Sequence, residues 1–377
     1  MSRIDELIAK LCPNGVEFKR LGNIARIKNG KDHKSLDEGI FPVYGSGGVM
    51  RYVDTYAYDK PSVLIPRKGS LGNLFYVDVP FWNVDTIFYT EVDASLVLPK
   101  FLYYFLTTVG LGEMNQAGGV PSQTQTILNE LKIPVPPIEV QREIVKVLDT
   151  FTKLEAELEA ELEARRRQYQ YYRDALLSFN EASVASASKQ ASKQASIRWA
   201  TLGEIATNLD SQRRPVTKSA RKAGEFPYYG ASGIVDYVSD YIFDGDYLLV
   251  SEDGANLLAR STPIAFSISG KTWVNNHAHV LQFNTYAERR FAEIYLNSID
   301  LSPYVSGAAQ PKLNQANLNR IPIPVPSLEE QTRIVAILDK FDALVNDLGS
   351  GLPAEIKARR QQYEHYRDRL LDFREAA

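Results

Sequence analysis

The stretch IPVPPIEVQREIVKVLDTF at residues 133–151 recurs as IPVPSLEEQTRIVAILDKF at residues 323–341, and this recurrence decides the fold. Eleven of the nineteen aligned positions are identical, at a constant offset of 190 residues. Further matches follow in the same order, among them FPVYGSGGV at 41–49 with FPYYGASGI at 226–234 and RRRQYQYYRDALLSF at 165–179 with RRQQYEHYRDRLLDF at 359–373. A period this long predicts two homologous copies of one unit and not a solenoid of short repeats.

Each copy changes character at a proline-rich strip, at 134–137 in the first copy and at 322–326 in the second. Proline ends regular structure and forms stiff, extended connectors. Before the strip, both copies are rich in glycine, aromatic and β-branched residues, with short apolar runs at 62–65 and 247–250 that are typical of strands. The sequence therefore predicts a β-rich domain with a few helices in each copy, and a mixed α/β (α+β) class for the chain.

After each strip, apolar residues recur at spacings of three and four, which predicts a long helix with a narrow apolar seam. A helix of roughly 38 residues would be about 57 Å long, too long to fold back into its own domain. We expect the two seams to bury each other in a coiled-coil stalk between the domains, and an antiparallel pair would relate the copies by a pseudo-twofold axis. The segment GSGLP at 349–353 predicts a break or kink in the second helix. The residues expected to pack in the helices or against partners are Ile144, Leu148, Phe151, Leu154, Leu158, Leu162, Tyr169, Ile334, Leu338, Phe341, Leu344 and Tyr363.

Two tracts of low complexity have different interpretations. SVASASKQASKQAS at 183–196 is small and polar, which is typical of a flexible linker. LEAELEAELEA at 154–164 keeps its leucines on one stripe of a helix, and we interpret it as a ruler. The predicted division is a first β-rich domain at 1–135, a central helical region at 136–181, a linker at 182–196, a second β-rich domain at 197–325 and a C-terminal helical region at 326–377.

The composition limits the possible partners. A chain of 377 residues suits two domains, and its net charge of -3 means that any binding of nucleic acid must come from local basic patches. One cysteine and four histidines are too few for the usual structural zinc sites, so no metal is expected. The N-terminus lacks a signal-peptide core and no apolar run approaches the roughly 20 residues of a membrane span. We therefore expect a cytoplasmic protein with no membrane partner and no small-molecule substrate.

The chain resembles the specificity subunits of type I restriction-modification systems over essentially its whole length. The matching features are LCPNGVEFKRLG at 11–22, the YGSGG and YGASG turns, VLIPRKGSLGNLFYVDVPFWNVDT at 63–86, the two proline strips with the helices that follow, and the RRQQYxxYRDxLL endings. The specificity of the resemblance lies in the order of these features, which occurs twice. In the second helical region GSGLP replaces the LEAE repeats, so the two helices need not be equivalent.

The resemblance implies a function. In this family, each β-rich domain is a target recognition domain that recognises one half of a bipartite DNA site, and the helices set the half-site spacing and hold two methyltransferase subunits. Restriction and translocase subunits complete the assembly. It also implies N6 methylation of adenine in double-stranded DNA by the partners, which would carry S-adenosylmethionine, ATP and Mg²⁺, while this chain has no cofactor. The LEAE tract is similar to a short tandem repeat whose number is associated with spacer length in some members.

Candidate DNA contacts lie on the predicted loops, because phosphate and base contacts usually come from loops that carry basic and small polar residues. The segment at 208–222 holds five basic residues and is the strongest basic patch of the chain. The candidates are Lys28, Asn29, Lys31, Lys34, Ser46, Arg67, Lys68, Ser70, Ser122, Gln123, Arg213, Arg214, Lys218, Arg221, Lys222, Ser232, Asn256 and Lys312.

Each group of candidates also has a structural interpretation. A basic loop can be merely solvated, and the glycine turns can be plain β-turns instead of sites of close approach to DNA. His277 and His279 have a metal-capable spacing on one face of a strand, but without a third ligand a packing or DNA-contacting role is favoured. The arginines at 165–167 and 359–360 can contact phosphate or form salt bridges. The helix tyrosines Tyr169, Tyr172, Tyr363 and Tyr366 can stack on bases, but helical spacing favours a core or partner interface.

The sequence offers no catalytic site. The Asp/Asn-Pro-Pro-aromatic motif of amino methyltransferases does not occur, nor does a P-loop, and the E-x-K triplets at 130–132 and 355–357 lack a properly placed upstream aspartate. We expect a DNA-binding adaptor without catalytic residues. The alternatives are a helical scaffold that kept the fold but lost DNA recognition, and, less favoured, a self-sufficient methyltransferase.

Overall fold

The computed structural model describes residues 3–114, 122–179, 197–307 and 310–376. They form two compact units. Unit 1 comprises Met1–Ala160 and Ala354–Ala377, and unit 2 comprises Glu161–Pro353. The predicted linker at 182–196 lies outside the described residues. The predicted domain boundaries follow the repeat in the sequence, whereas the units follow contacts in space, so those boundaries stay predictions.

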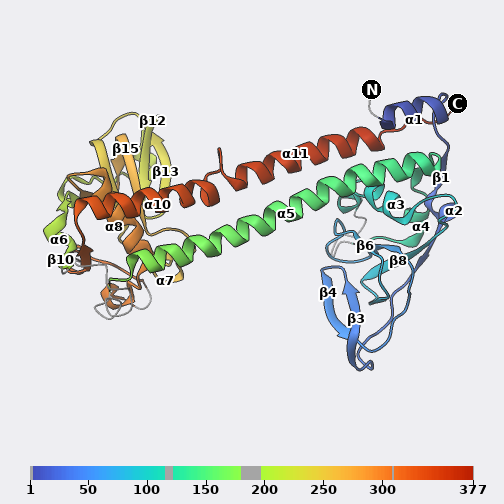
Figure 1. Ribbon diagram of the computed structural model, residues 1–377, viewed down its shortest axis with the longest axis horizontal. Helices are drawn as coiled ribbons and strands as arrows, with labels where there is room; N and C mark the ends of the chain where they lie inside the picture. The colour runs from blue at the N-terminus through green and yellow to red at the C-terminus, as the bar shows by residue number, and fades with distance from the viewer. Residues whose placement is uncertain (1–2, 115–121, 180–196, 308–309, 377) are drawn as a thin grey trace, which may run out of the picture. The chain divides into compact units, whose positions relative to one another are not determined.

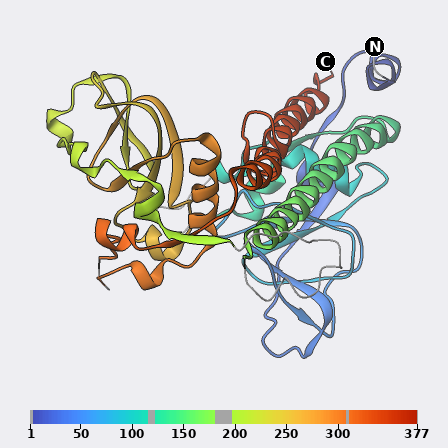
Figure 2. The same cartoon turned by 60° about the vertical axis from the view of Figure 1, so that its left-hand side comes forward.

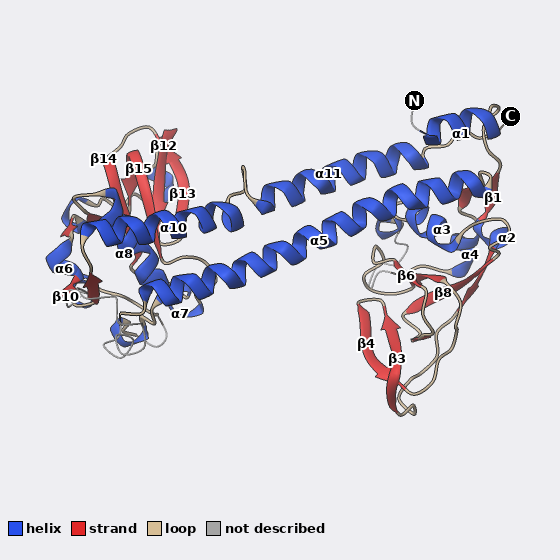
Figure 3. Cartoon of the chain, in the orientation of Figure 1, coloured by secondary structure: helices blue, strands red, loops and turns tan. Residues whose placement is uncertain are grey.

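Unit 1 contains a four-stranded sheet of order β2-β8-β5-β6, a three-stranded sheet of order β4-β3-β7 and the pair β1-β9. In Figure 3 the hairpin β3-β4 stands out as two adjacent strands. The elements are α1 (Arg3–Leu11), β1 (Phe18–Arg20), α2 (Leu21–Ile24), β2 (Ala25–Lys28), β3 (Glu38–Gly45), β4 (Gly48–Val53), β5 (Ser62–Pro66), β6 (Phe75–Val77), β7 (Trp82–Asn83), β8 (Ile87–Val92), α3 (Pro99–Leu106), η1 (Leu111–Glu113), α4 (Gln125–Asn129), β9 (Lys132–Pro134) and α5 (Ile138–Leu177), which continues into unit 2.

Unit 2 repeats this plan with its main strands joined in one six-stranded sheet of order β11-β16-β14-β15-β12-β13, beside the pair β10-β17. Figure 2 shows α8 and this sheet within the unit. The elements are β10 (Arg198–Thr201), α6 (Leu202–Ile205), β11 (Thr207–Asn208), η3 (Asp210–Gln212), η4 (Lys218–Ala220), β12 (Ala223–Gly230), β13 (Gly233–Val238), β14 (Phe243–Ser251), α7 (Asn256–Ala259), β15 (Ala265–Val274), β16 (Ala278–Gln282), α8 (Tyr286–Ser298), η5 (Ser302–Tyr304), α9 (Gln315–Asn319), β17 (Pro322–Val325), α10 (Leu328–Asn346) and α11 (Leu352–Leu371), whose greater part belongs to unit 1.

The strands predicted from the apolar runs at 62–65 and 247–250 are confirmed as β5 and the end of β14. Both lie inside their sheets, between β6 and β8 in one case and between β15 and β16 in the other. Every residue of β5 is buried, as are the last five residues of β14. A strand covered on both faces has a continuous apolar run instead of an alternating one, which explains why these two runs were visible in the sequence.

The first turns of the two long helices complete the cores of their own units. Ile144 and Leu148 of α5 are fully buried in the core of unit 1, and Ile334 and Leu338 of α10 are 1% and 0% exposed in the core of unit 2. These four residues are therefore buried within their own units, and their predicted role in helix or partner packing stays a prediction. The proline strips lead directly into these helices, since the N–H of Val140 donates to the carbonyl of Pro137.

A buried glutamine at the start of each helix fixes this junction. The side chain of Gln141 donates to the carbonyl of Pro136 at 2.8 Å, and its amide oxygen accepts from the N–H of Leu98. Gln331, at the matching place, donates to the carbonyl of Pro326 at 3.0 Å. The carbonyl of one proline in each strip thus accepts a hydrogen bond from the glutamine side chain. This bond connects the strip with the helix.

Helix α5 is 40 residues long, close to the predicted length, and it is paired with a helix of the other copy in each unit (Figure 1). In unit 1, Phe151 stacks on Tyr366 of α11 with ring centroids 5.4 Å apart. In unit 2, Tyr172 stacks on Phe341 of α10 at 5.5 Å. Phe151 matches Phe341 in the repeat, and Tyr172 matches Tyr366, so the two contacts are reciprocal. Reciprocal contacts of this kind are what a pseudo-twofold relation between the copies predicts.

The LEAE tract is helical, as predicted, but its leucines do not form a continuous buried seam. Leu154 is 41% exposed, and Leu344 of α10 is 38% exposed. A four-residue repeat advances about 40° around a helix at each step, so its stripe winds away from a neighbouring helix. These two leucines are thus only partly covered within the chain, and their packing in the helices or against a partner subunit stays a prediction.

The predicted break in the second helical region is confirmed, because α10 ends at Asn346 and α11 begins at Leu352. The N–H of Gly351 donates to the carbonyl of Asp347 across the break. A Cβ at Gly351 would lie 2.5 Å from the carbonyl oxygen of Ala343, so only glycine fits there. None of the helices in the described ranges is long and apolar enough to span a bilayer.

Candidate nucleic-acid interface

Four segments of unit 1 meet where β7 leads into β8. They are the end of β2, the turn of the β3-β4 hairpin, the turn after β5, and the segment before α4. Main-chain N–H groups donate all four hydrogen bonds that hold them, and three of the four acceptors are main-chain carbonyls. The hydrogen bonds are Lys31 N to Asn83 O (2.9 Å), Arg67 N to Thr86 O (2.8 Å), Ser46 N to Thr86 Oγ1 (3.3 Å) and Gln123 N to Arg67 O (2.9 Å).

This junction gathers several of the predicted DNA contacts, namely Lys31, Ser46, Arg67, Lys68, Ser122 and Gln123. They differ in what their side chains can do. Lys68 is exposed and lies 3.9 Å from Asp85, whereas Arg67 is half-buried over the ring of Phe88. Gln123 is 3% exposed and donates to the carbonyl of Leu111, so its side chain supports the fold.

The remaining candidates of unit 1 lie around this junction or outside it. Asn29 accepts a hydrogen bond from Gln125 at 3.4 Å, which connects the end of β2 with the start of α4. Lys28 pairs with Glu91 at 4.0 Å. Lys34 belongs to the loop after β2, where its N–H donates to Asp32. Ser70 belongs to the turn after β5, where its carbonyl accepts from the N–H of Asn73. Direct contact of these residues with DNA stays a prediction.

Unit 2 builds the same junction from equivalent main-chain hydrogen bonds. The N–H of Glu252 donates to the carbonyl of His277 at 2.9 Å, as that of Arg67 does to Thr86. The N–H of Leu313 donates to the carbonyl of Glu252 at 2.8 Å, as that of Gln123 does to Arg67. The strand registers agree, since Ile65 pairs with Phe88 and Val250 with His279. Positions in the two copies can therefore be equated one by one.

The basic patch at 208–222 is divided by the structure. Arg213 is 13% exposed in its side chain and is held by two carboxylates, and Arg221 lies 4.3 Å over the ring of Tyr228 and pairs with Asp236 at 3.0 Å. Arg214, Lys218 and Lys222 are exposed instead. The last three are accessible to a ligand, whereas the first two hold the fold. DNA contact by any of the five stays a prediction.

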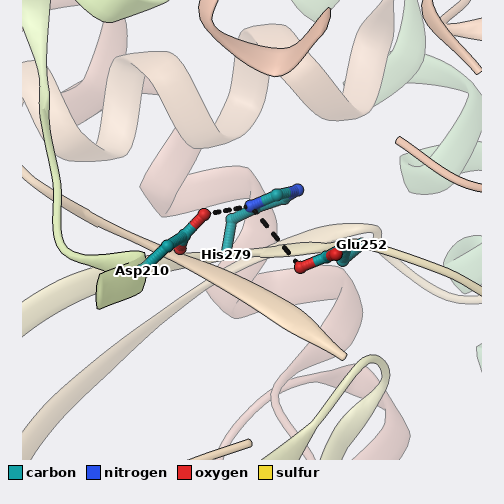
Figure 4. A group of neighbouring side chains, drawn as sticks. All are labelled: Asp210, Glu252 and His279. Carbon is teal, nitrogen blue, oxygen red and sulfur yellow. Dashed lines mark hydrogen bonds and ion pairs between the residues drawn. The ribbon is translucent and has the colours of Figure 1, made fainter. Parts of the chain in front are cut away.

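A buried ionic network lies beneath the junction of unit 2 (Figure 4). His279 is fully buried, with Nδ1 2.6 Å from a carboxylate oxygen of Asp210 and Nε2 2.7 Å from the carbonyl of Leu313. Each ring nitrogen of His279 therefore has a polar partner within hydrogen-bond distance. The carboxylate of Glu252 lies 3.8 Å from the same Nδ1 (Figure 4).

Cations balance the two carboxylates of the network. Arg213 approaches Asp210 at 3.4 Å and Glu252 at 2.6 Å, and Lys312 lies 3.1 Å from Glu252. Burial would raise the pKa of Asp210, but the hydrogen bond from His279 and the charge of Arg213 outweigh burial and lower that pKa. Burial likewise opposes the hydrogen bonds from Arg213 and Lys312 at Glu252, whose pKa is lowered overall.

Asp210, Glu252 and His279 could in principle supply three metal ligands, since one ligand atom of each lies within 4.8 Å of the others. The sequence alone suggested no third ligand for the histidines. In the structure, however, Arg213 and Lys312 occupy the carboxylates, and both ring nitrogens of His279 are engaged. A divalent cation would have to displace these positive charges from a buried site, so the arrangement favours an internal ionic network.

The expectation that His277 and His279 lie on one face of a strand is wrong. Strand β16 begins at Ala278, so His277 belongs to the preceding turn. Its ring is exposed and pairs with Asp253 at 2.8 Å, whereas His279 points into the core. Alternation of side chains holds only inside a strand.

Two small polar candidates of unit 2 lie beside this junction. The carbonyl of Ala231, next to Ser232, accepts from Ser251 at 2.5 Å. The side chain of Asn256 accepts from Ser261 and donates to the carbonyl of Thr262, so it holds its own loop together. DNA contact by Ser232 and Asn256 stays a prediction.

Glu252, Asp253 and the role of Asp210 were not predicted from the sequence, because basic residues were taken as the sign of DNA contact and these three are carboxylates. The signal that could have found them is the alignment of the two copies, which sets SEDG at 251–254 against PRKG at 66–69.

Comparison with known proteins gives a consistent result. Residues 13–164 and 198–358 match the family described as "Type I restriction modification DNA specificity domain". The type I restriction enzyme EcoprrI specificity subunit of Escherichia coli is 36% identical over 312 residues, 77% of this chain and 73% of the relative. The EcoR124I/EcoR124II specificity subunit of the same species is 32% identical over 310 residues, 75% of this chain and 73% of the relative. A specificity-subunit relative from Haemophilus influenzae is 40% identical over 183 residues, and this match spans about half of each chain, 48% and 47%.

Solved structures share the fold. The type I restriction-modification S subunit from M. genitalium has a TM-score of 0.63 at 19% identity, covering 95% of this chain and 96% of that one. A chain from a study of complex assembly and conformational transition of a type I system has a TM-score of 0.55 at 17% identity, covering 95% and 98%.

Proposed function

The chain belongs to the family of type I restriction-modification DNA specificity domains, matched over both of its copies, and we propose that each of its two units recognises one half of a bipartite site in double-stranded DNA. The two recognition domains contribute the binding loops. Adenine methylation and DNA cleavage are carried out by partner subunits. In this proposal the chain acts in the cytoplasm as an adaptor and has no catalytic residue of its own.

The observation that carries the proposal is the junction present in both units. The main-chain hydrogen bonds of Arg67 with Thr86 and Gln123 have equivalents at Glu252 with His277 and Leu313, while the side chains on these segments differ. A constant frame with variable side chains is what two recognition domains for two different half-sites require, because base edges are distinguished by donors, acceptors and apolar groups.

The helices provide the rest of the proposed assembly. Each unit pairs α5 with a helix of the other copy, and the exposed Leu154 and Leu344 are available for a partner. We infer two methyltransferase subunits on the helices, with S-adenosylmethionine bound by them, and restriction and translocase subunits that use ATP and Mg²⁺. The length of α5 would set the half-site spacing.

Filter binding with random bipartite oligonucleotides tests DNA recognition. The purified chain, with its methyltransferase subunits, should retain a defined subset of duplexes at about 150 mM salt, where non-specific binding is weak. A helical scaffold without DNA recognition would retain duplexes only in a salt-sensitive and sequence-independent way. That result would contradict the proposal.

A further inference from the structure

The turn after β5 and the turn after β14 occupy equivalent places but carry opposite charges. Arg67 and Lys68 follow β5, whereas Glu252 and Asp253 follow β14. The equivalence rests on backbone pairing and not on sequence alone. Lys68 forms an isolated antiparallel β-bridge with Ser122, and Asp253 forms one with Lys312. The next residue of each turn is a glycine with positive φ, 82° at Gly69 and 105° at Gly254, so both turns have the same backbone course.

The charge reversal extends to the residues beneath the turns. In unit 1, the guanidinium of Arg67 lies 5.8 Å over the ring of Phe88. In unit 2, the equivalent Glu252 lies 3.8 Å from the ring of His279, which takes the place of Phe88 in the strand register. A guanidinium is attracted to the face of a phenyl ring, and a carboxylate to the polar edge of an imidazole, whereas a carboxylate over Phe88 would have no such attraction. The residue beneath the turn thus differs between the copies together with the residue on the turn. Incidental variation among solvated side chains would not require such a paired difference.

The outer residue of each turn faces solvent. Lys68 is exposed, with 47% of its side chain accessible. The carboxylate of Asp253 is 34% accessible and is oriented by Nδ1 of His277 at 2.8 Å. Its other lone pairs can still accept, since a carboxylate has about four acceptor positions. One turn therefore offers a donor and the other an acceptor at the same place.

Given the proposed function, we infer that these turns are specificity determinants and recognise different bases at equivalent positions of the two half-sites: Lys68 a guanine, and Asp253 a cytosine. In the major groove, lysine and arginine donate to O6 and N7 of guanine, and aspartate accepts from the N4 amino group of cytosine. The carboxylate would repel a phosphate, so this turn of unit 2 acts on a base edge, while Arg214 and its exposed neighbours supply the phosphate contacts.

Methylome sequencing tests this inference, in a methylation-free host that carries the chain with its methyltransferase subunit. Lys68→Met keeps the apolar stem but removes the donors, and it should lower discrimination at one guanine of the first half-site by about tenfold. Asp253→Asn keeps the shape of the side chain but removes its charge. This variant should lower discrimination at one cytosine of the second half-site. In each variant the other half-site and the spacer should be unchanged.

The chain offers matched controls at the opposite ends of the same strands. Lys60 precedes β5 and Asp244 lies near the start of β14, and both are exposed. Lys60→Met and Asp244→Asn should leave the methylated sequence unchanged. The conservative variant Lys68→Arg should keep the guanine, because arginine also donates to its O6 and N7.

The outcomes distinguish this inference from the function on which it rests. The inference alone is overturned if the unmodified chain has a bipartite sequence and the correctly folded variants Lys68→Met and Asp253→Asn recognise it with full specificity. Relaxed specificity at bases other than guanine and cytosine would also overturn it. Circular dichroism checks the fold of each variant. Absence of any bipartite sequence for the unmodified chain would overturn the proposed function itself.

Discussion

At the scale of single residues, Arg213 shows how position changes the meaning of a basic residue. It lies in the strongest basic patch, yet its guanidinium is only 13% exposed and lies between Asp210 and Glu252. Arg214, the next residue, is exposed. The same residue type at consecutive positions thus supports the fold in one case and is accessible to a ligand in the other.

This difference predicts opposite effects for two neighbouring substitutions. Arg213→Ala leaves two buried carboxylates without their shared cation and should lower the free energy of unfolding of unit 2 by about 3–5 kcal/mol. Arg214→Ala should change it by less than about 0.5 kcal/mol but weaken DNA binding. Urea unfolding followed by tryptophan fluorescence, together with a DNA-binding assay, measures both. Equal stability losses in the two variants would contradict the role given to Arg213.

The network also predicts how stability depends on pH. The pKa values of Asp210 and Glu252 are lowered in the folded chain, so both carboxylates contribute stability above their unfolded pKa of about 4, and this contribution is lost as pH falls through the lower folded values. Unit 2 should therefore lose stability below about pH 4. In Arg213→Ala the folded pKa values should lie closer to the unfolded ones, so the loss of stability on acidification should be smaller. Thermal unfolding between pH 3 and 7 measures this, and identical profiles for the two proteins would argue against the network.

The sequence could predict which loops carry candidate contacts, but not that these loops meet or which of their side chains are accessible. Lys31, Ser46, Arg67 and Lys68 were identified from the glycine-rich and basic loops. The burial of Arg213 and Gln123 depends on partners distant in the chain, such as Glu252 and Leu111, and a local pattern does not contain them.

At the scale of elements, α5 is buried at its start and exposed further along. Leu148 is fully buried in the core of unit 1, whereas Leu154 on the same helix is 41% exposed. Leu148→Ala should therefore cost about 2–5 kcal/mol of unfolding free energy, since it removes buried methyl groups and leaves a cavity. Leu154→Ala removes the same groups from a partly solvated position and should cost less than about 1 kcal/mol. Chemical unfolding of both variants compares them; a larger loss at Leu154 would show that the tract is buried after all.

The LEAE tract supports a second prediction for α5. The helix is continuous through 154–164, so one further LEAE unit after Ala164 should lengthen it by about 6 Å. Base pairs rise about 3.4 Å each, on the basis of roughly 10 base pairs per 34 Å turn, so the recognised spacer should lengthen by one or two base pairs. Methylome sequencing of cells with the insertion gives the spacer directly. An unchanged spacer would mean that the tract is not a ruler.

Elements were predictable where a repeat or a helix breaker marks them. The duplication, the two long helices and the break at GSGLP all follow from patterns that persist over many residues. The winding of the LEAE stripe was missed because apolar spacing of four alone resembles a seam over a short stretch, while the 40° advance at each step accumulates only over several turns.

At the scale of the whole molecule, the two copies share one frame and differ in the chemistry they present. Main-chain hydrogen bonds fix the junction in each unit, and reciprocal stacking of Phe151 with Tyr366 and of Phe341 with Tyr172 joins each copy to the helix of the other. The net charge of -3 does not reveal DNA binding, because the cations predicted to serve it are few and confined to loops.

Methylome sequencing of a methylation-free host that carries this chain with its methyltransferase subunit tests the central claim most directly. The account predicts methylated adenine in one bipartite sequence, with two different defined half-sites separated by a spacer of constant length. Exchange of residues 197–325 for the equivalent segment of another specificity subunit should replace the second half-site and leave the first intact. A continuous recognition sequence, or a change in both half-sites after this exchange, would contradict the account.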